Sequence, residues 1–182
     1  GMGEVGVVRG TGPKNGDLIA WGVLAAALLA PLHGLIRFTG PPMEEGFMLL
    51  FPQLVAAGKV PNVDFLHLYG PGSLWALAGV YKVFGASLEV QRLVGWFQHG
   101  ALVVGLYTLI RPWSRLLATG VALTALVQVI TPVGLTALAW DGAIALAVWS
   151  LVLATASLDL QTAGPDLTDA DILKPGIRNR RR

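Results

Sequence analysis

Hydrophobic residues along this chain are gathered into long runs, separated by polar or glycine- and proline-containing segments. A helix of about 20 residues, rising 1.5 Å per residue, crosses the roughly 30 Å of hydrocarbon in a bilayer. Runs of suitable length predict four transmembrane helices, at residues 18–36, 93–110, 116–130 and 135–158. The last two come from one apolar stretch that Pro132 and Gly134 are expected to break. We therefore expect an all-α polytopic membrane protein.

A cleaved signal peptide is the alternative explanation of residues 18–36. The run is longer than the usual apolar part of a signal peptide, and no small-x-small cleavage site follows it. Arg37 also lies at its far end. We predict a permanent transmembrane helix here.

The segment GSLWALAGVYKVFG, residues 72–85, is a candidate for a fifth span. It is short and carries Lys82, which favours an interfacial or re-entrant helix. With four spans, the N-terminus, the Arg111 and Arg115 loop and the arginine-rich C-terminus lie on one side, and the positive-inside rule makes that side the cytoplasm. A fifth span would export that loop and the C-terminus, so we predict four.

Residues 37–92 then form one external loop, preceded by a cytoplasmic segment at 1–17 and followed, after the membrane domain 18–158, by a disordered cytoplasmic tail at 159–182. Within the loop, apolar residues recur at helical spacing, and Glu45 and Gln53 point away from them. This apolar stripe consists of Met43, Phe47, Leu50, Phe51 and Leu54. The pattern predicts two juxtamembrane amphipathic helices on the bilayer. Pro52 is expected to kink the first, the second runs from about Ser73 to Phe84, and the glycine- and proline-rich segment between them is expected to be irregular.

Composition supports a membrane environment. Of the 182 residues, 54% are hydrophobic and 13% are charged, about half the charged share of an ordinary soluble domain. The net charge is +2, and the basic residues form local groups without a basic face and interleaved aromatics, which argues against a nucleic-acid partner. The C-terminal arginines are expected to contact anionic membrane lipids. Cysteine is absent, which excludes disulfides, thiolate metal sites and cysteine nucleophiles.

The external loop has an ordered set of motifs. The stretch MEEGFMLLFPQLVAAGKVPNVDFLHLYGPGSLWALAGVYKVFGASLEVQRLVG contains, in order, Glu44-Glu45-Gly46, Gly58, Pro61, Asp64, Gly70-Pro71, Val83-Phe84-Gly85 and Arg92. This order resembles the first external loop of the GT-C membrane glycosyltransferases, the group that includes protein O-mannosyltransferases and lipid A aminoarabinose transferases. The resemblance covers residues 43–95 closely, and the flanking spans only as generic apolar helices.

The resemblance implies an inverting transfer of a sugar from a polyprenyl-phosphate donor to an acceptor hydroxyl, on the external face of the inner membrane. By motif position Glu44 is the catalytic base, Glu45 binds the acceptor or raises the pKa of Glu44, and Asp64 assists. Two features depart from the family. Glu44 stands where the family usually has Asp, and the family's chains have many more spans. We therefore expect a truncated form whose donor cavity is incomplete, with a membrane-protein partner supplying the missing helices.

The other candidate site residues are chosen by charge and position. Lys59, His67 and Arg92 are candidates for binding the donor phosphate, and Tyr69 and Asp141 for lining the substrate site. A nucleotide-sugar donor is not expected, because no Rossmann pattern is present and GTGPKNG lacks the P-loop spacing. The three histidines form no metal-spaced cluster, so no metal site or cofactor is assigned, although carboxylates alone could hold a divalent cation.

Each candidate also has a purely structural explanation. Glu44 and Glu45 could simply occupy the first turn of a helix, where the helix dipole favours acids. Asp64 follows Pro-Asn-Val and could cap a turn, and His67 and Tyr69 could pack a loop.

Asp141 lies inside the predicted fourth span, about two turns from its external end. A carboxylate there needs a partner or a cavity. A hydrogen bond to Gln98, His99 or Gln128 on a neighbouring helix is the structural alternative.

Two functions remain open besides a glycosyltransferase. One is a non-catalytic scaffold or assembly partner that binds lipid or another membrane protein through the amphipathic loop. The other is a transporter or channel subunit with Asp141 as its polar site. Four spans without an inverted repeat or a second broken helix argue against a self-sufficient transporter.

Overall fold

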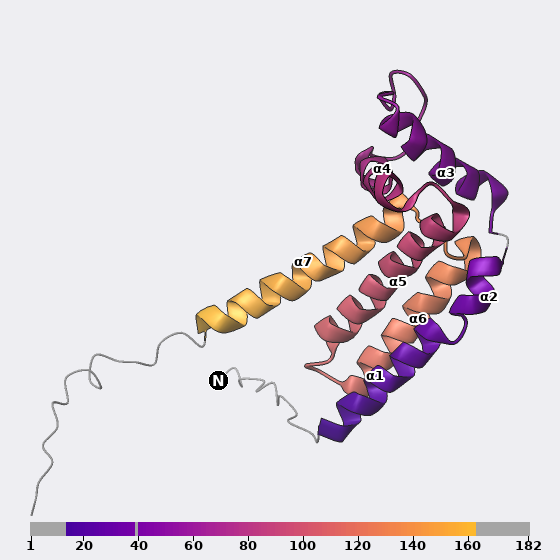
Figure 1. Cartoon of the computed structure of the whole chain (residues 1–182). Coiled ribbons are helices and arrows are strands. Elements are labelled where there is room, and N and C mark those ends of the chain that lie inside the picture. Colours follow the sequence, from indigo (N-terminus) through magenta and orange to yellow (C-terminus); the bar gives the residue numbers. More distant parts are fainter. Residues whose placement is uncertain (1–13, 39, 163–182) are drawn as a thin grey trace, which may run out of the picture.

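The computed structural model describes residues 14–38 and 40–162, and this part of the chain forms seven helices and no β-strand (Figure 1). They are α1 (Lys14–Leu29), α2 (Leu32–Arg37), α3 (Pro42–Ala56), α4 (Gly72–Phe84), α5 (Leu88–Ile110), α6 (Arg115–Val133) and α7 (Ala139–Thr162). Residues 1–13 of the predicted N-terminal segment and 163–182 of the predicted tail lie outside the described residues.

The prediction of an all-helical membrane protein with four spans is confirmed. Within the described residues, four helical stretches are long and apolar enough to cross a membrane: Gly16–Arg37, Leu88–Ile110, Arg115–Val133 and Ala139–Leu158. In Figure 1 they run side by side, with α3 and α4 at the end where α2 ends and α5 begins. The start of α1, the turn between α5 and α6, and the end of α7 lie toward the opposite end.

Proline explains why the first span differs from the single helix that we expected. The helix breaks at Ala30 and Pro31, because proline has no N–H for the backbone ladder and its ring clashes with the preceding turn. At this break the indole N–H of Trp96 donates to the carbonyl of Leu28 at 3.2 Å. A side chain of α5 therefore satisfies a carbonyl at the end of α1.

The other span boundaries also shift. The second span begins at Leu88 rather than 93, because the Ser87 hydroxyl accepts a hydrogen bond from the N–H of Val90 and caps the helix. Pro132 lies inside α6, and the break falls at Gly134, which has a φ of +63°. The last helix therefore starts at Ala139, four residues later than expected, and continues to Thr162, through the first residues of the predicted tail.

Both loop helices are present, with irregular backbone between them as expected. Pro52 lies inside α3 and cannot donate to the carbonyl of Met48, four residues earlier. The buried hydroxyl of Tyr81 on α4 donates to that carbonyl at 2.9 Å. Burial raises the pKa of Tyr81 to about 12, so this donor stays protonated. The Tyr81 hydroxyl thus satisfies the carbonyl that Pro52 leaves without a partner, and this hydrogen bond joins α3 to α4.

We expect Tyr81→Phe to lower the free energy of unfolding by about 1–3 kcal/mol, because the Met48 carbonyl is left buried and unpaired. The effect should shrink in a Pro52→Ala background, where residue 52 regains an N–H for the same carbonyl. A double-mutant cycle measured by unfolding in mixed micelles tests this coupling. Additive effects of the two substitutions would contradict it.

The loop helices rest on the bundle through the connection between α6 and α7. Buried residues of α3 and α4 pack against Val133, Ala137 and Leu138. Gly95 on α5 allows this connection to approach, since a Cβ there would lie 2.0 Å from the carbonyl oxygen of Leu135. At the far end, Asp17 of α1 pairs with Arg111 and Arg115. Asp17 therefore partly neutralises the basic connection between α5 and α6, whose positive charge is the basis for the predicted orientation in the membrane.

Candidate functional site

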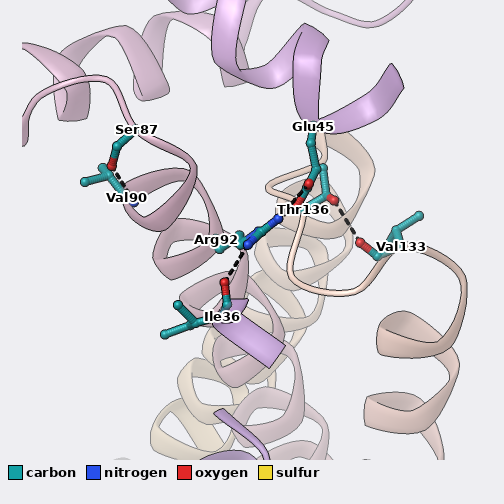
Figure 2. A network of polar contacts seen from close by, with 7 residues as sticks. All are labelled: Ile36, Glu45, Ser87, Val90, Arg92, Val133 and Thr136. Atoms are coloured by element: carbon teal, nitrogen blue, oxygen red, sulfur yellow. Dashed lines mark hydrogen bonds and ion pairs between the residues drawn. The ribbon is translucent and has the colours of Figure 1, made fainter. Parts of the chain in front are cut away.

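The two adjacent acids, Glu44 and Glu45, lie in the first turn of α3 but face different surroundings. Glu45 is buried, with 4% of its surface exposed. Its carboxylate forms a two-pronged ion pair with Arg92 of α5: Nε to Oε1 at 2.7 Å and Nη2 to Oε2 at 2.8 Å (Figure 2). Helical geometry turns successive side chains by about 100°, so one acid can point inward while its neighbour does not.

Arg92 joins three segments of the chain. Besides binding Glu45, its Nη1 donates to the carbonyl of Ile36 in the last turn of α2 (Figure 2). Gly40 completes the site, because a Cβ there would lie 2.8 Å from Oε1 of Glu45. The carboxylate of Glu45 and the guanidinium of Arg92 are therefore both engaged in contacts within the protein. The sequence assigned Glu45 and Arg92 to separate roles, whereas the structure pairs them.

Glu44 instead lines a small pocket of about 170 Å³ between α3 and the segment that follows it. Phe47, Met48, Phe51 and Leu66 form most of the apolar wall, and His67 and Tyr69 contribute polar groups. The side chain of Glu44 forms no hydrogen bond or ion pair with the described residues. Three of the predicted site residues, Glu44, His67 and Tyr69, are thus brought together.

His67 is held in place by its backbone and its ring. Its N–H donates to Oδ1 of Asn62 at 3.0 Å, and its ring makes edge contacts with Phe51 and Tyr69. The side-chain atom Nε2 is buried and has no partner among the described residues. Burial lowers the pKa of His67, so the ring is neutral near pH 7. A neutral imidazole with a free nitrogen can hydrogen-bond a ligand in the pocket.

As the pH is lowered, we expect the free energy of unfolding of the protein to fall more steeply than that of a His67→Gln variant. The folded state disfavours the charged ring, whereas the unfolded chain takes up a proton as the pH falls through about 6.5. The His67 contribution is therefore lost below that pH. Melting temperatures of both proteins measured between pH 7.5 and 5.5 should converge or cross, and parallel curves would contradict this assignment.

Asp64 and Lys59 lie outside this pocket. Oδ2 of Asp64 accepts a hydrogen bond from the N–H of Val60 at 2.7 Å, and the Asp64 N–H donates to the Val60 carbonyl. Asp64 therefore caps its own turn, as the structural alternative predicted. Lys59 is exposed, and its side chain forms no hydrogen bond or ion pair with the described residues.

Asp141 is in the first turn of α7, not two turns inside the span, because the helix begins at Ala139. It is 1% exposed, and its Oδ2 lies 3.3 Å from Nε2 of His99, which is fully buried on α5. The expected hydrogen bond to a neighbouring helix is thus found, with His99 as the partner. This contact joins α7 to α5. The sequence alone suggested three possible partners for Asp141 and did not distinguish among them.

Sequence reasoning did not predict that several polar side chains would be buried without a partner. Both side-chain atoms of Gln91, Oε1 of Gln98 and Oγ of Ser73 are buried without a partner in the described structure. Glutamine and serine inside apolar helices are visible in the sequence, but their burial depends on which helix face meets a neighbour. Within residues 14–38 and 40–162, no group of three His, Asp or Glu side chains could hold a metal ion.

Comparisons with protein-family models, with curated proteins and with solved structures found no match to this chain. The chemistry of the site must therefore be argued from its own residues. The arrangement provides one carboxylate at a largely apolar pocket, beside a neutral histidine and a tyrosine, with the neighbouring carboxylate bound to arginine.

Proposed function

We propose that this protein is a membrane glycosyltransferase-like protein of the GT-C type. The reaction is transfer of a sugar from a polyprenyl-phosphate donor to an acceptor hydroxyl on the external face of the membrane. The observation that carries the proposal is the division of the acidic pair. Arg92 occupies Glu45, while Glu44 lines the pocket with His67 and Tyr69 and has no cation beside it. Of the two acids, Glu44 is the one available to accept a proton.

In the proposed reaction the acceptor oxygen forms a bond to the anomeric carbon of the donor sugar. The bond from that carbon to the phosphate oxygen breaks, and the polyprenyl phosphate leaves with the electron pair. Glu44 takes the acceptor proton, and the configuration of the sugar inverts. Because Arg92 is bound to Glu45 and Ile36, and Lys59 lies outside the Glu44 pocket, His67 is the candidate within the pocket for binding the departing phosphate.

The proposed topology is that of a multi-pass inner-membrane protein with both termini in the cytoplasm. The arrangement of the helices supports it, since the start of α1, the turn between α5 and α6 and the end of α7 lie toward one end, and α3 and α4 lie at the other (Figure 1). We propose that the protein's partners are a lipid-linked sugar donor, membrane lipids and another membrane protein.

The test is transfer by the protein reconstituted in nanodiscs. Radiolabelled polyprenyl-phosphate mannose and polyprenyl-phosphate aminoarabinose are supplied as donors, with and without a divalent cation, and products are separated from the donor by solvent extraction. Label in an acceptor, or saturable binding of one donor that the other does not displace, supports the proposal. Neither transfer nor saturable binding with either donor would reject it for these sugars.

A non-catalytic scaffold is the second candidate function. The observation that favours it is the apolar surface of the segment between α3 and α4, where Val63, Leu66 and Leu68 are each at least 75% exposed. Exposed apolar clusters commonly mark contact surfaces for proteins or membranes. Donor binding that is unchanged by substitution of Glu44, together with absence of transfer, would favour the scaffold.

A further inference from the structure

A second cavity lies between α4, α5 and α7, adjacent to the Glu44 pocket. It has a volume of about 500 Å³, and Tyr69 lines both cavities. We call it the α4–α7 cleft. Its walls come from the first turns of α4 and α7, from Gln98 on α5, and from a stripe on α7 that ends at Leu146. At 1.5 Å per residue, the stripe from Ala139 to Leu146 extends about 10 Å down the helix.

The part of the cleft lined by Ala76 of α4 and by Ala139, Ala143 and Leu146 of α7 is apolar. Ala143 and Leu146 are exposed in the structure, on a helix that is apolar enough to span the membrane. This part of the cleft suits one hydrocarbon chain that enters from the bilayer.

The lining of the cleft also includes polar groups that lack hydrogen-bond partners among the described residues. Oγ of Ser73 and Oε1 of Gln98 are buried and form no hydrogen bond with the described residues. Tyr69 and Trp140 flank them and are about two-fifths exposed, at 41% and 38%. Buried polar atoms without partners lose the hydrogen bonds that they would make in water, so a ligand that restores those bonds is favoured. A hydroxyl group of a ligand can both donate and accept a hydrogen bond, so it can pair with the Ser73 hydroxyl and with the amide oxygen of Gln98.

The absence of charged side chains from the described lining of the cleft favours a neutral ligand over an anionic one. No Asp, Glu, Lys or Arg is among the described residues that line the cleft. The nearest ionisable side chain in sequence is Asp141, which lies between two lining residues and is turned toward His99. A phosphate headgroup in this apolar cleft would lack a cation and would lie near a carboxylate, which is unfavourable at low dielectric.

We infer that the α4–α7 cleft binds an uncharged, hydroxyl-bearing amphiphile, with its chain along α7 and its hydroxyls at Ser73 and Gln98. The inference rests on the proposed function for one step: because Tyr69 borders both cavities, this amphiphile is the acceptor whose hydroxyl reaches Glu44. The acceptor class is then a neutral glycolipid or alkyl glycoside, rather than a peptide or an anionic lipid.

The experiment uses the protein in nanodiscs and an octyl β-glucoside probe that carries a diazirine in its alkyl chain, without any glycosyl donor. We expect photolabelling at residues 139–146 and 72–76, displaced by octyl β-glucoside but at least tenfold less effectively by octyl phosphate, each below its micelle-forming concentration. Ala143→Leu should fill the cleft and abolish labelling, whereas Ala147→Leu, an exposed change outside the lining, should not. Ser73→Ala should weaken displacement by octyl β-glucoside about fivefold, the loss expected for one neutral hydrogen bond, whereas the control Ser150→Ala should leave it unchanged.

Equal displacement by octyl phosphate, labelling that survives Ala143→Leu, or labelling outside both segments would overturn the inference. The labelling needs neither donor nor Glu44, so its outcome is separate from that of the transfer assay. Labelling that depends on Ala143 in a protein that transfers no sugar would retain the binding site and reject the proposed function. Transfer without such labelling would support the proposed function and reject the binding site.

Discussion

Glu44→Gln should abolish sugar transfer, with kcat falling by about 10²–10⁴-fold, the range usual for loss of a positioned general base. Glutamine keeps the size and hydrogen-bonding ability of the side chain but cannot take the acceptor proton. The side chain of Glu44 forms no hydrogen bond or ion pair with the described residues, so the substitution should leave membrane insertion and the melting temperature unchanged. Transfer rates, donor binding and melting temperature are measured on the same reconstituted samples.

Two further variants separate the role of Glu44 from a general effect of charge. Glu44→Asp keeps the carboxylate and shortens its reach by one methylene, so it should retain part of the activity that Glu44→Gln lacks. Glu89→Gln, which removes an exposed acid from the first turn of α5, should have no effect on kcat. Full activity in Glu44→Gln would remove Glu44 as the base.

The four spans could be predicted from the sequence because length and hydropathy alone decide whether a helix can cross a bilayer. Their boundaries were less predictable, since they depend on individual hydrogen bonds. Ser87 moves the start of α5 by five residues through one cap, and α6 continues past Pro132 until the positive φ of Gly134 ends it. A window of hydropathy does not contain this information.

The site was only partly predictable for a similar reason. Motif position selected Glu44, and charge and position in the same external loop selected His67 and Tyr69; the structure places all three at one pocket. Periodicity also indicated that Glu45 points away from the exposed apolar residues of α3, but it did not identify Arg92, 47 residues away, as its partner. Long-range pairs of this kind depend on how helices cross, and one sequence does not specify those crossings.

The Glu45–Arg92 pair is expected to determine whether the loop helices stay on the bundle. Arg92 contacts α2, α3 and its own helix α5, and the side chains of the pair are at most 9% exposed. Removing one partner leaves a buried charge without its counterion, which typically costs about 3–5 kcal/mol. Glu45→Ala and Arg92→Met should therefore each lower the free energy of unfolding by that amount, as measured by reversible unfolding in mixed micelles.

The double variant Glu45→Met, Arg92→Met separates the pair interaction from the cost of burying each charge. Two apolar side chains of similar length leave no buried charge, so the double variant should be more stable than either single variant. Because neither Glu45 nor Arg92 lines the Glu44 pocket, the double variant should also recover sugar transfer if Glu45 is only structural. Recovery of stability without recovery of transfer would instead assign Glu45 to the reaction, and additive losses in stability would show that the two side chains act independently.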